Sequence, residues 1–144
     1  MPPTHACHPG AIVLVTDDDV LTRIAVAEYL RDCGYRVIEA SGGLETKILL
    51  TDVADVHVLF ADARLAGDDN GFALAQWARR NRHSVQVLLS AGLARKSEAA
   101  ASLCSHTTTS PPASHLRERI EAMNARHCRR VRDVGKGKPR AAYR

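Results

Sequence analysis

The segment Ala11–Asp19, AIVLVTDDD, places five apolar residues just before Thr16 and three consecutive carboxylates. A short apolar run bounded by polar residues is typical of a strand that is buried on both faces of a parallel sheet. Asp19 stands immediately before a segment with helical periodicity, so we expect it to be the N-cap of a helix. The segment therefore predicts a buried strand, an acidic strand end and a helix, in that order.

The same alternation of apolar runs and helix-like segments continues along most of the chain. Predicted strands cover residues 11–15, 35–40, 56–61 and 85–90. Predicted helices cover 20–33, 44–50, 71–82, 95–104 and 114–126. Parallel strands need crossover connections, and these connections cover both faces of the sheet. We therefore predict an α/β fold with a doubly wound parallel sheet and helices on both faces.

Polar side chains follow three of the predicted strands. Right-handed crossovers place the carboxyl ends of parallel strands at one edge of the sheet, where ligands of such sheets bind. Asp17 and Asp18 follow the first strand, Asp62 follows the third and Ser90 ends the fourth. Converging carboxylates repel one another, and a hard divalent cation such as Mg²⁺ removes that repulsion. Carboxylates, a metal ion and a hydroxyl donor together favour phosphoryl transfer onto an aspartate.

Composition indicates an ordinary globular protein. The chain has 144 residues, 45% of them hydrophobic and 25% charged, which fits one domain with a real core. It has no apolar run near the roughly 18 residues of a membrane helix, and its first ten residues do not resemble a secretion signal. We therefore expect a cytoplasmic location. The four cysteines form no CxxC pair, which favours reduced thiols over a disulfide framework or a zinc site.

Charge is unevenly distributed along the chain. Residues 126–144 hold eight Lys or Arg against Asp133 alone, a net of +7, while residues 1–125 hold 12 basic and 15 acidic side chains, a net of −3. We divide the chain into an N-terminal extension (1–10), a domain (11–126) and a basic tail predicted to be disordered (127–144). The tail could bind nucleic acid weakly by electrostatic attraction, and we expect no contact with membranes.

Residues 11–92 resemble the receiver domain of bacterial two-component response regulators. The resemblance is carried by VLVTDDDVLTRIAVAEYLRDCGYRVIEA, VLFADARLAGDDNGFALAQWARR and VQVLLSAG, in the order and spacing of the family. It implies a flavodoxin-like sheet of about five strands, as in CheY-like proteins.

The resemblance also implies a role for each residue at the acidic edge. Asp62 would be the phosphoacceptor, and Ser90 would supply the switch hydroxyl that contacts the phosphoryl group. Asp17 and Asp18 would be the acidic pair that binds Mg²⁺, with Asp62 and the backbone carbonyl of Arg64 as its other protein ligands.

The sequence departs from the family after the fourth predicted helix. Family members have a fifth apolar strand that ends in lysine and proline, whereas this chain reads CSHTTTSPPASHLRERI. Ser110 is the nearest counterpart of the lysine, and residues 105–109 lack the apolar side chains of a buried strand. We therefore expect a weak fifth strand, and a site that binds Mg²⁺ but is phosphorylated slowly or briefly because a lysine is missing.

The predicted function is that of a single-domain response regulator, a signalling phosphoacceptor and not an enzyme. Its partners would be a histidine kinase or phosphotransfer protein and an unidentified downstream protein, since no output domain fits in 127–144. One alternative is a degenerate receiver that binds partners independently of phosphorylation. A less favoured one is a haloacid-dehalogenase-like phosphatase with Asp17 as nucleophile and Asp19 as acid/base, for which the late acidic pair is lacking; the nearest residues are Glu118 and Glu121.

Overall fold

A computed structural model describes residues 10–67, 70–104, 115–116, 118–122 and 125. Strands and helices alternate along the chain in the order β1 (Ile12–Thr16), α1 (Val20–Asp32), β2 (Arg36–Ala40), α2 (Gly43–Asp52), β3 (Val56–Asp62), α3 (Gly71–Asn81), β4 (Gln86–Ser90) and α4 (Leu93–Cys104). The predicted alternation is confirmed, and α4 begins two residues earlier than expected. Within the described ranges, no helix is both long enough and apolar enough to cross a membrane.

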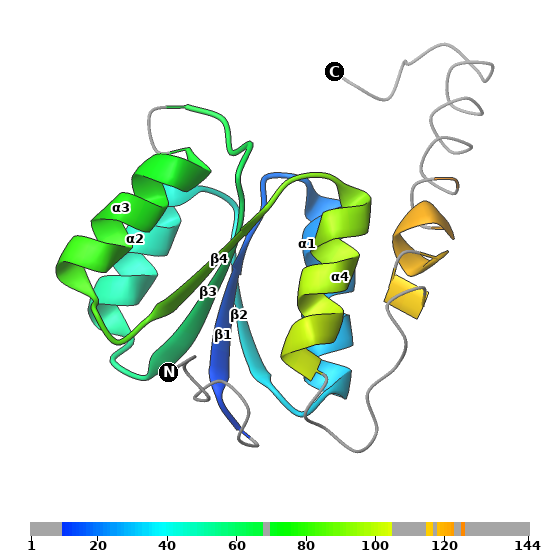
Figure 1. Cartoon of the computed structure of the whole chain (residues 1–144), viewed down its shortest axis with the longest axis horizontal. Helices are drawn as coiled ribbons and strands as arrows, with labels where there is room; N and C mark the ends of the chain where they lie inside the picture. Colours follow the sequence, from blue (N-terminus) through cyan, green and yellow to red (C-terminus); the bar gives the residue numbers. More distant parts are fainter. Residues whose placement is uncertain (1–9, 68–69, 105–114, 117, 123–124, 126–144) are drawn as a thin grey trace, which may run out of the picture.

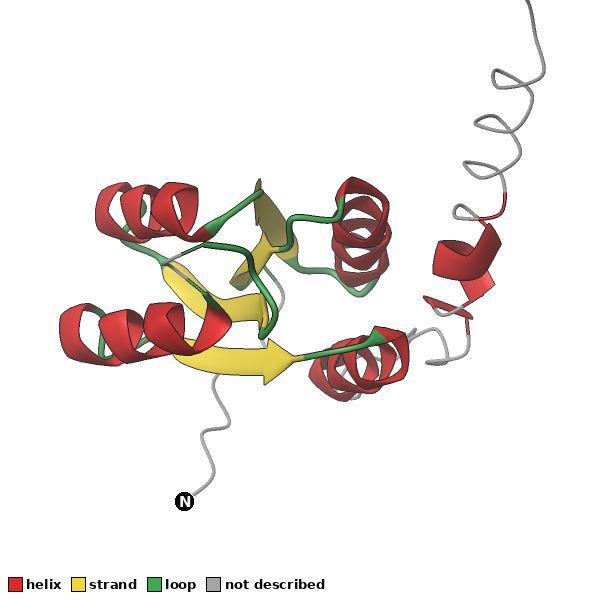
Figure 2. Ribbon diagram, turned by 90° about the horizontal axis from the view of Figure 1, so that it is seen from above, coloured by secondary structure: helices red, strands yellow, loops and turns green. Residues whose placement is uncertain are grey.

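The four strands form one parallel sheet in the order β2-β1-β3-β4. Because β2 and β3 lie on opposite sides of β1, right-handed crossovers place α1 on one face and α2 and α3 on the other. Figures 1 and 2 show this arrangement, with α2 and α3 together on one side of the sheet and α1 on the opposite side. The predicted doubly wound α/β fold is therefore confirmed.

Two hydrophobic clusters, one on each face, bury the central strands. Val13 and Val15 of β1 pack in the cluster that includes α1 and α4, whereas Ile12 and Leu14 pack in the cluster that includes α2 and α3. Successive strand residues point to opposite faces, so a strand covered on both sides must be apolar throughout. This explains the uninterrupted apolar run of residues 11–15.

Helix α4 packs on the same face as α1, as Figure 1 shows. A right-handed crossover to a further parallel strand beside β4 would instead place α4 on the face of α2 and α3. The position of α4 thus differs from the one that a five-stranded sheet requires. The expected weak strand at 105–109 and the lysine position at Ser110 lie outside the described residues.

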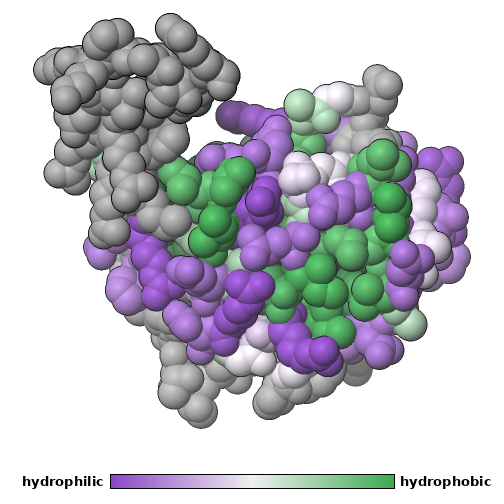
Figure 3. Space-filling model, turned by 180° about the vertical axis from the view of Figure 1, so that it is seen from behind, coloured by the Kyte–Doolittle hydropathy of each residue, from purple (hydrophilic) through white to green (hydrophobic). Residues whose placement is uncertain are grey.

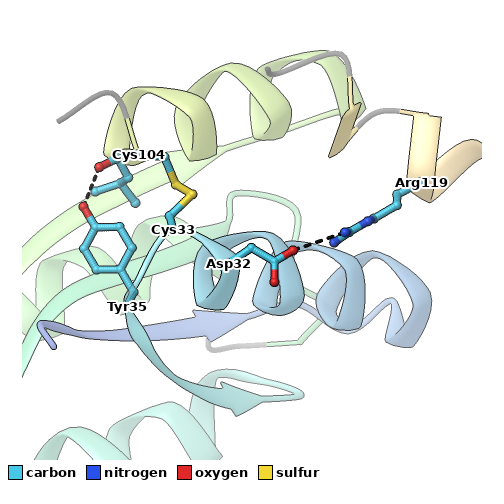
Figure 4. Close-up of a disulfide and its surroundings, with 6 residues drawn as sticks. Asp32, Cys33, Tyr35, Cys104 and Arg119 are labelled. Atoms are coloured by element: carbon cyan, nitrogen blue, oxygen red, sulfur yellow. Dashed lines mark hydrogen bonds and ion pairs between the residues drawn. A yellow bond between two sulfur atoms is a disulfide. The ribbon is translucent and has the colours of Figure 1, made fainter. Parts of the chain in front are cut away.

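A disulfide joins the C-terminal ends of α1 and α4. Cys33 follows α1 directly and Cys104 ends α4, with their Cα atoms 5.7 Å apart (Figure 4). Nearby, the Tyr35 hydroxyl donates a hydrogen bond to the backbone carbonyl of Leu103. The expectation that all cysteines are reduced thiols is wrong for this pair, because 71 residues of sequence separation hide their proximity in space. The cytoplasmic location stays a prediction.

The last described residues pack against the face of α1 and α4. Leu116 and Ile120, which lie in the helix predicted at 114–126, are both buried in the cluster that includes α1 and α4. Arg119 forms an ion pair with Asp32 at 3.2 Å (Figure 4). Residues 1–9 and 126–144 lie outside the described part, so the boundaries at 10 and 127 stay predictions.

The surface seen from behind carries apolar residues in two areas with hydrophilic residues between them (Figure 3). The large apolar side chains that are exposed in the described structure are Val20, Leu44, Ile48 and Phe72. Three of these four lie in the first two residues of α1, α2 and α3. The first turns of these helices follow strand ends, so Val20, Leu44 and Phe72 lie toward the carboxyl edge of the sheet.

Candidate functional site

Three carboxylates meet at the carboxyl edge of the sheet. Asp17 follows β1 and Asp62 ends β3, and one oxygen from each of Asp17, Asp18 and Asp62 lies within 4.8 Å of the others. We call these residues the acidic trio. Asp17 is 3% exposed and Asp62 9% exposed, while Asp18 is exposed. This set fits a hard cation such as Mg²⁺, which takes a few carboxylate oxygens and completes its shell with water from the open side.

Backbone hydrogen bonds hold the two buried carboxylates in place. The amide of Asp19 donates to Asp17 Oδ1 at 3.0 Å, and the amide of Arg64 donates to Asp62 Oδ1 at 2.7 Å. Each carboxylate therefore has one oxygen held by its own loop and a second oxygen directed elsewhere. Asp19 is the N-cap residue of α1, as predicted, although its carboxylate accepts from the Thr22 hydroxyl rather than from a backbone amide.

The start of α3 packs directly against the strand end that carries Asp62. Asn70 caps α3, with its side-chain oxygen accepting from the Ala73 amide at 2.9 Å. A Cβ atom at Gly71 would lie 2.4 Å from the backbone oxygen of Asp62 and 2.6 Å from Ala63 Cα. Real Cβ atoms do not approach backbone that closely, so this position admits only glycine without a shift of the chain.

Lys96 of α4 extends into the acidic trio. Its Nζ atom donates to Asp17 Oδ2 at 2.7 Å and to Asp62 Oδ2 at 2.6 Å, and the residue is 7% exposed. The ammonium thus neutralises part of the charge that the trio concentrates. Our expectation that no lysine reaches this site is wrong, because Lys96 of α4 donates to two of its carboxylates. The assignment of Ser110 as the counterpart of the family's lysine stays a prediction.

Burial and this bridge shift the pKa values of two groups. Burial raises the pKa of Asp17 above its usual range, and the hydrogen bond from Lys96 opposes that shift in part. Burial alone would lower the pKa of Lys96, but its hydrogen bonds to Asp17 and Asp62 outweigh burial and raise the pKa. Lys96 is therefore a cation at neutral pH, despite being almost fully enclosed.

Ser90 lies next to Asp62 across the sheet. The two residues are register partners at the ends of β4 and β3, and the Ala63 amide donates to the Ser90 carbonyl at 3.1 Å. The Ser90 hydroxyl is buried and has no hydrogen-bond partner within the described structure. An unpartnered buried hydroxyl beside a carboxylate is free to donate to a group added there. The role of the Arg64 carbonyl stays a prediction, because only the Arg64 amide has an observed contact in this site.

From the sequence we predicted that Asp17, Asp18, Asp62 and Ser90 lie at the carboxyl edge of the sheet, and the structure places them there. We did not predict Lys96. One signal was present: residues 96, 100, 103 and 104 recur at helical spacing, and all four are buried. A lysine on the apolar stripe of a helix needs a buried partner, and the acidic trio is that partner. Residues 11–126 contain only two lysines, Lys47 and Lys96, so few candidates had to be considered.

The sequence matches no family model and no curated protein. The structure does resemble solved ones. A response regulator receiver protein from Pseudomonas putida is 24% identical over 57% of this chain and 69% of its own, with a TM-score of 0.50. The isolated receiver domain of RcsB from Salmonella enterica serovar Typhimurium, solved with the phosphomimetic BeF₃⁻, is 17% identical over 81% of this chain and 89% of its own, with a TM-score of 0.52.

The chain has the receiver-domain fold. Identities this low show the fold and leave the chemistry to be argued from this chain's own residues. The chain also spans only 41% of the length of RcsB in its complex with DNA, at 21% identity and a TM-score of 0.51. Within the receiver fold, the acidic trio occupies the edge where strand ends of such sheets hold their ligands.

Proposed function

We propose that this protein is a response regulator receiver that accepts a phosphoryl group on Asp62 with Mg²⁺ bound at the acidic trio. The observation that carries the proposal is the convergence of Asp17, Asp18 and Asp62 within 4.8 Å, with Lys96 on two of them. Asp17, Asp18, Asp62 and the Arg64 carbonyl would hold the ion. Bound Mg²⁺ would neutralise charge on the incoming phosphate, which supplies much of the catalysis in phosphoryl transfer.

The transfer itself needs only a nucleophile and a donor. A carboxylate oxygen of Asp62 attacks the phosphorus of the donor and forms a P–O bond. The bond from phosphorus to the leaving group breaks, and the leaving group takes the electron pair; from acetyl phosphate it leaves as acetate. The Ser90 hydroxyl, buried and without a partner in the described structure, would donate a hydrogen bond to the new phosphoryl group.

A partner protein would reach Asp62 from the carboxyl edge of the sheet. Val20, Leu44 and Phe72 are exposed in the first turns of α1, α2 and α3, which lie toward that edge. Exposed apolar side chains around a polar site favour protein docking over binding of a free small molecule. A histidine kinase or phosphotransfer protein upstream fits this surface, and the downstream target would be another protein.

The alternatives are less well supported by the geometry. In a phosphatase of the haloacid-dehalogenase type, Asp19 would act as acid/base, but its carboxylate accepts from Thr22. A phosphorylation-independent interaction module would not need a cation buried on two carboxylates, since such a buried bridge adds little net stability. The buried bridge therefore favours a site that binds charged groups, such as a cation and a phosphoryl group, over an interaction module.

Phosphorylation by acetyl phosphate tests the proposal. Wild-type protein with Mg²⁺ should gain one phosphoryl group, detected by intact-mass spectrometry and located on Asp62 by borohydride reduction and peptide mapping. Asp62→Ala and Asp18→Ala should gain none, because one lacks the acceptor and the other a metal ligand. Asp52→Ala, at the exposed end of α2, is the matched control and should behave like wild type. Equal labelling of wild type and Asp62→Ala would refute the assignment.

A further inference from the structure

We propose that Lys96 is the phosphoryl-binding cation of this site and that it competes with Mg²⁺ for Asp17. The inference rests on the proposed function and adds to it a residue from α4, where the family resemblance pointed to the end of a fifth strand. Its basis is one contact pattern: the Nζ atom bridges Asp17 Oδ2 and Asp62 Oδ2, at 2.7 Å and 2.6 Å.

First, Lys96 and a divalent ion would compete for the carboxylates of Asp17 and Asp62. Asp17 Oδ1 and Asp62 Oδ1 each accept one backbone amide. Lys96 holds both Oδ2 atoms. Each carboxylate oxygen can accept more than one partner, but a divalent ion within the acidic trio repels the ammonium and competes with it for these oxygens. We therefore expect Lys96 to leave Asp17 when the ion binds and to stay beside Asp62.

The second step is charge balance. The acidic trio carries three negative charges and Lys96 one positive charge, a net of −2 that Mg²⁺ brings to zero. Phosphorylation turns the singly charged Asp62 into a doubly charged acyl phosphate, which leaves the loaded site at −1. Without Lys96 it would stand at −2. The ammonium thus opposes metal entry and stabilises the phosphorylated form.

The third step is that Lys96 connects the site to α4. Only Ala91 and Gly92 separate β4 from α4, and Lys96 is the fourth residue of the helix. The other end of α4 is held by the disulfide from Cys104 to Cys33. A change in the partners of Lys96 is therefore transmitted to the first turns of α4, while its C-terminal end stays attached to α1.

Two binding measurements on Lys96→Met test the inference, because they should move in opposite directions. Calorimetry should show Mg²⁺ binding about tenfold tighter than in wild type, since a repelling charge is lost. Fluorine NMR should show Mg²⁺-dependent BeF₃⁻ binding about tenfold weaker or worse, since a charged donor is lost. Lys47→Met removes the other lysine of the domain, which is half-buried on α2 with its Nζ over the Trp77 ring, and should change neither value.

Each outcome has a distinct meaning. Wild-type binding of Mg²⁺ and BeF₃⁻ with no change in Lys96→Met would overturn the role of Lys96 and leave the proposed function standing. Absence of both ligands from wild type would overturn the two together. Lys96→Arg keeps the charge and should bind Mg²⁺ as wild type does. This result would show that the change in Lys96→Met comes from the lost charge and not from misfolding.

A measurement on the wild-type protein tests the competition without relying on a variant that could misfold. Mg²⁺ alone should speed amide hydrogen exchange at residues 93–100, because Lys96 loses a partner, and leave residues 47–52 of α2 unchanged. Unchanged exchange at 93–100 with Mg²⁺ bound would overturn the competition.

Discussion

Gly71 sets how closely α3 approaches the backbone of β3, the strand that ends at Asp62. An added Cβ would meet the Asp62 carbonyl at 2.4 Å, so Gly71→Ala must push α3 away from β3. We expect a loss of about 1–3 kcal/mol in the free energy of unfolding, as for overpacking in a core, and weaker Mg²⁺ binding because Asp62 shifts. Urea unfolding and calorimetry measure the two effects.

Gly42→Ser is the control for this substitution. Gly42 is the N-cap residue of α2, has an extended backbone and has nothing within 4 Å of a built Cβ. Serine is a favourable N-cap residue, so the free energy of unfolding should change by no more than about 0.5 kcal/mol. A Gly71→Ala protein as stable as Gly42→Ser would contradict the close packing of α3 on Asp62.

Individual site residues differ in how far sequence alone could predict them. Asp17, Asp62 and Ser90 were predictable because each directly follows or ends an apolar strand, and strand ends of a parallel sheet meet at one edge. Lys96 was not, because a position on a helix does not say which strand ends that helix faces. Its helical spacing with Ala100, Leu103 and Cys104 indicates a lysine on an apolar helix face, but this spacing does not identify the lysine's partner.

At the scale of elements, α4 differs most from the predicted arrangement. Its existence and length were predictable from local helical periodicity, but the face on which it packs depends on contacts with α1 and with Leu116 and Ile120. The packing of α4 on α1 also brings Cys104 close to Cys33, so the disulfide could not be predicted from the sequence. The packing of α4 on α1 thus determines both the disulfide and the approach of Lys96.

The disulfide should contribute strongly to stability. It closes a loop of 71 residues, for which the chain-entropy model gives about 4 kcal/mol of stabilisation. In a Cys7→Ser/Cys128→Ser background, further replacement of Cys33 and Cys104 by serine should lower the free energy of unfolding by roughly that amount, measured by urea denaturation. The parent double variant should show no free thiol when denatured without reductant. Two free thiols there would mean that the disulfide does not form.

At the scale of the whole molecule, the sheet concentrates three negative charges at one edge and α4 supplies the balancing cation. The buried bridge from Lys96 to Asp17 and Asp62 couples this edge to the layer formed by α1 and α4. Under the proposed function, the charge that a partner meets at the carboxyl edge would change with Mg²⁺ binding and with phosphorylation. The layers of the fold were predictable from alternation alone, whereas this coupling was not.

A crystal structure of the protein with Mg²⁺ and BeF₃⁻ tests the central claim most directly. We expect BeF₃⁻ on a carboxylate oxygen of Asp62 and Mg²⁺ bound by Asp17, Asp18 and Asp62. The Nζ atom of Lys96 should lie about 3 Å from a fluorine and away from Asp17. Density for BeF₃⁻ elsewhere would contradict the assignment of Asp62. BeF₃⁻ on Asp62 with Lys96 still bridging the two aspartates, or with a different cation on the fluorines, would contradict the role of Lys96.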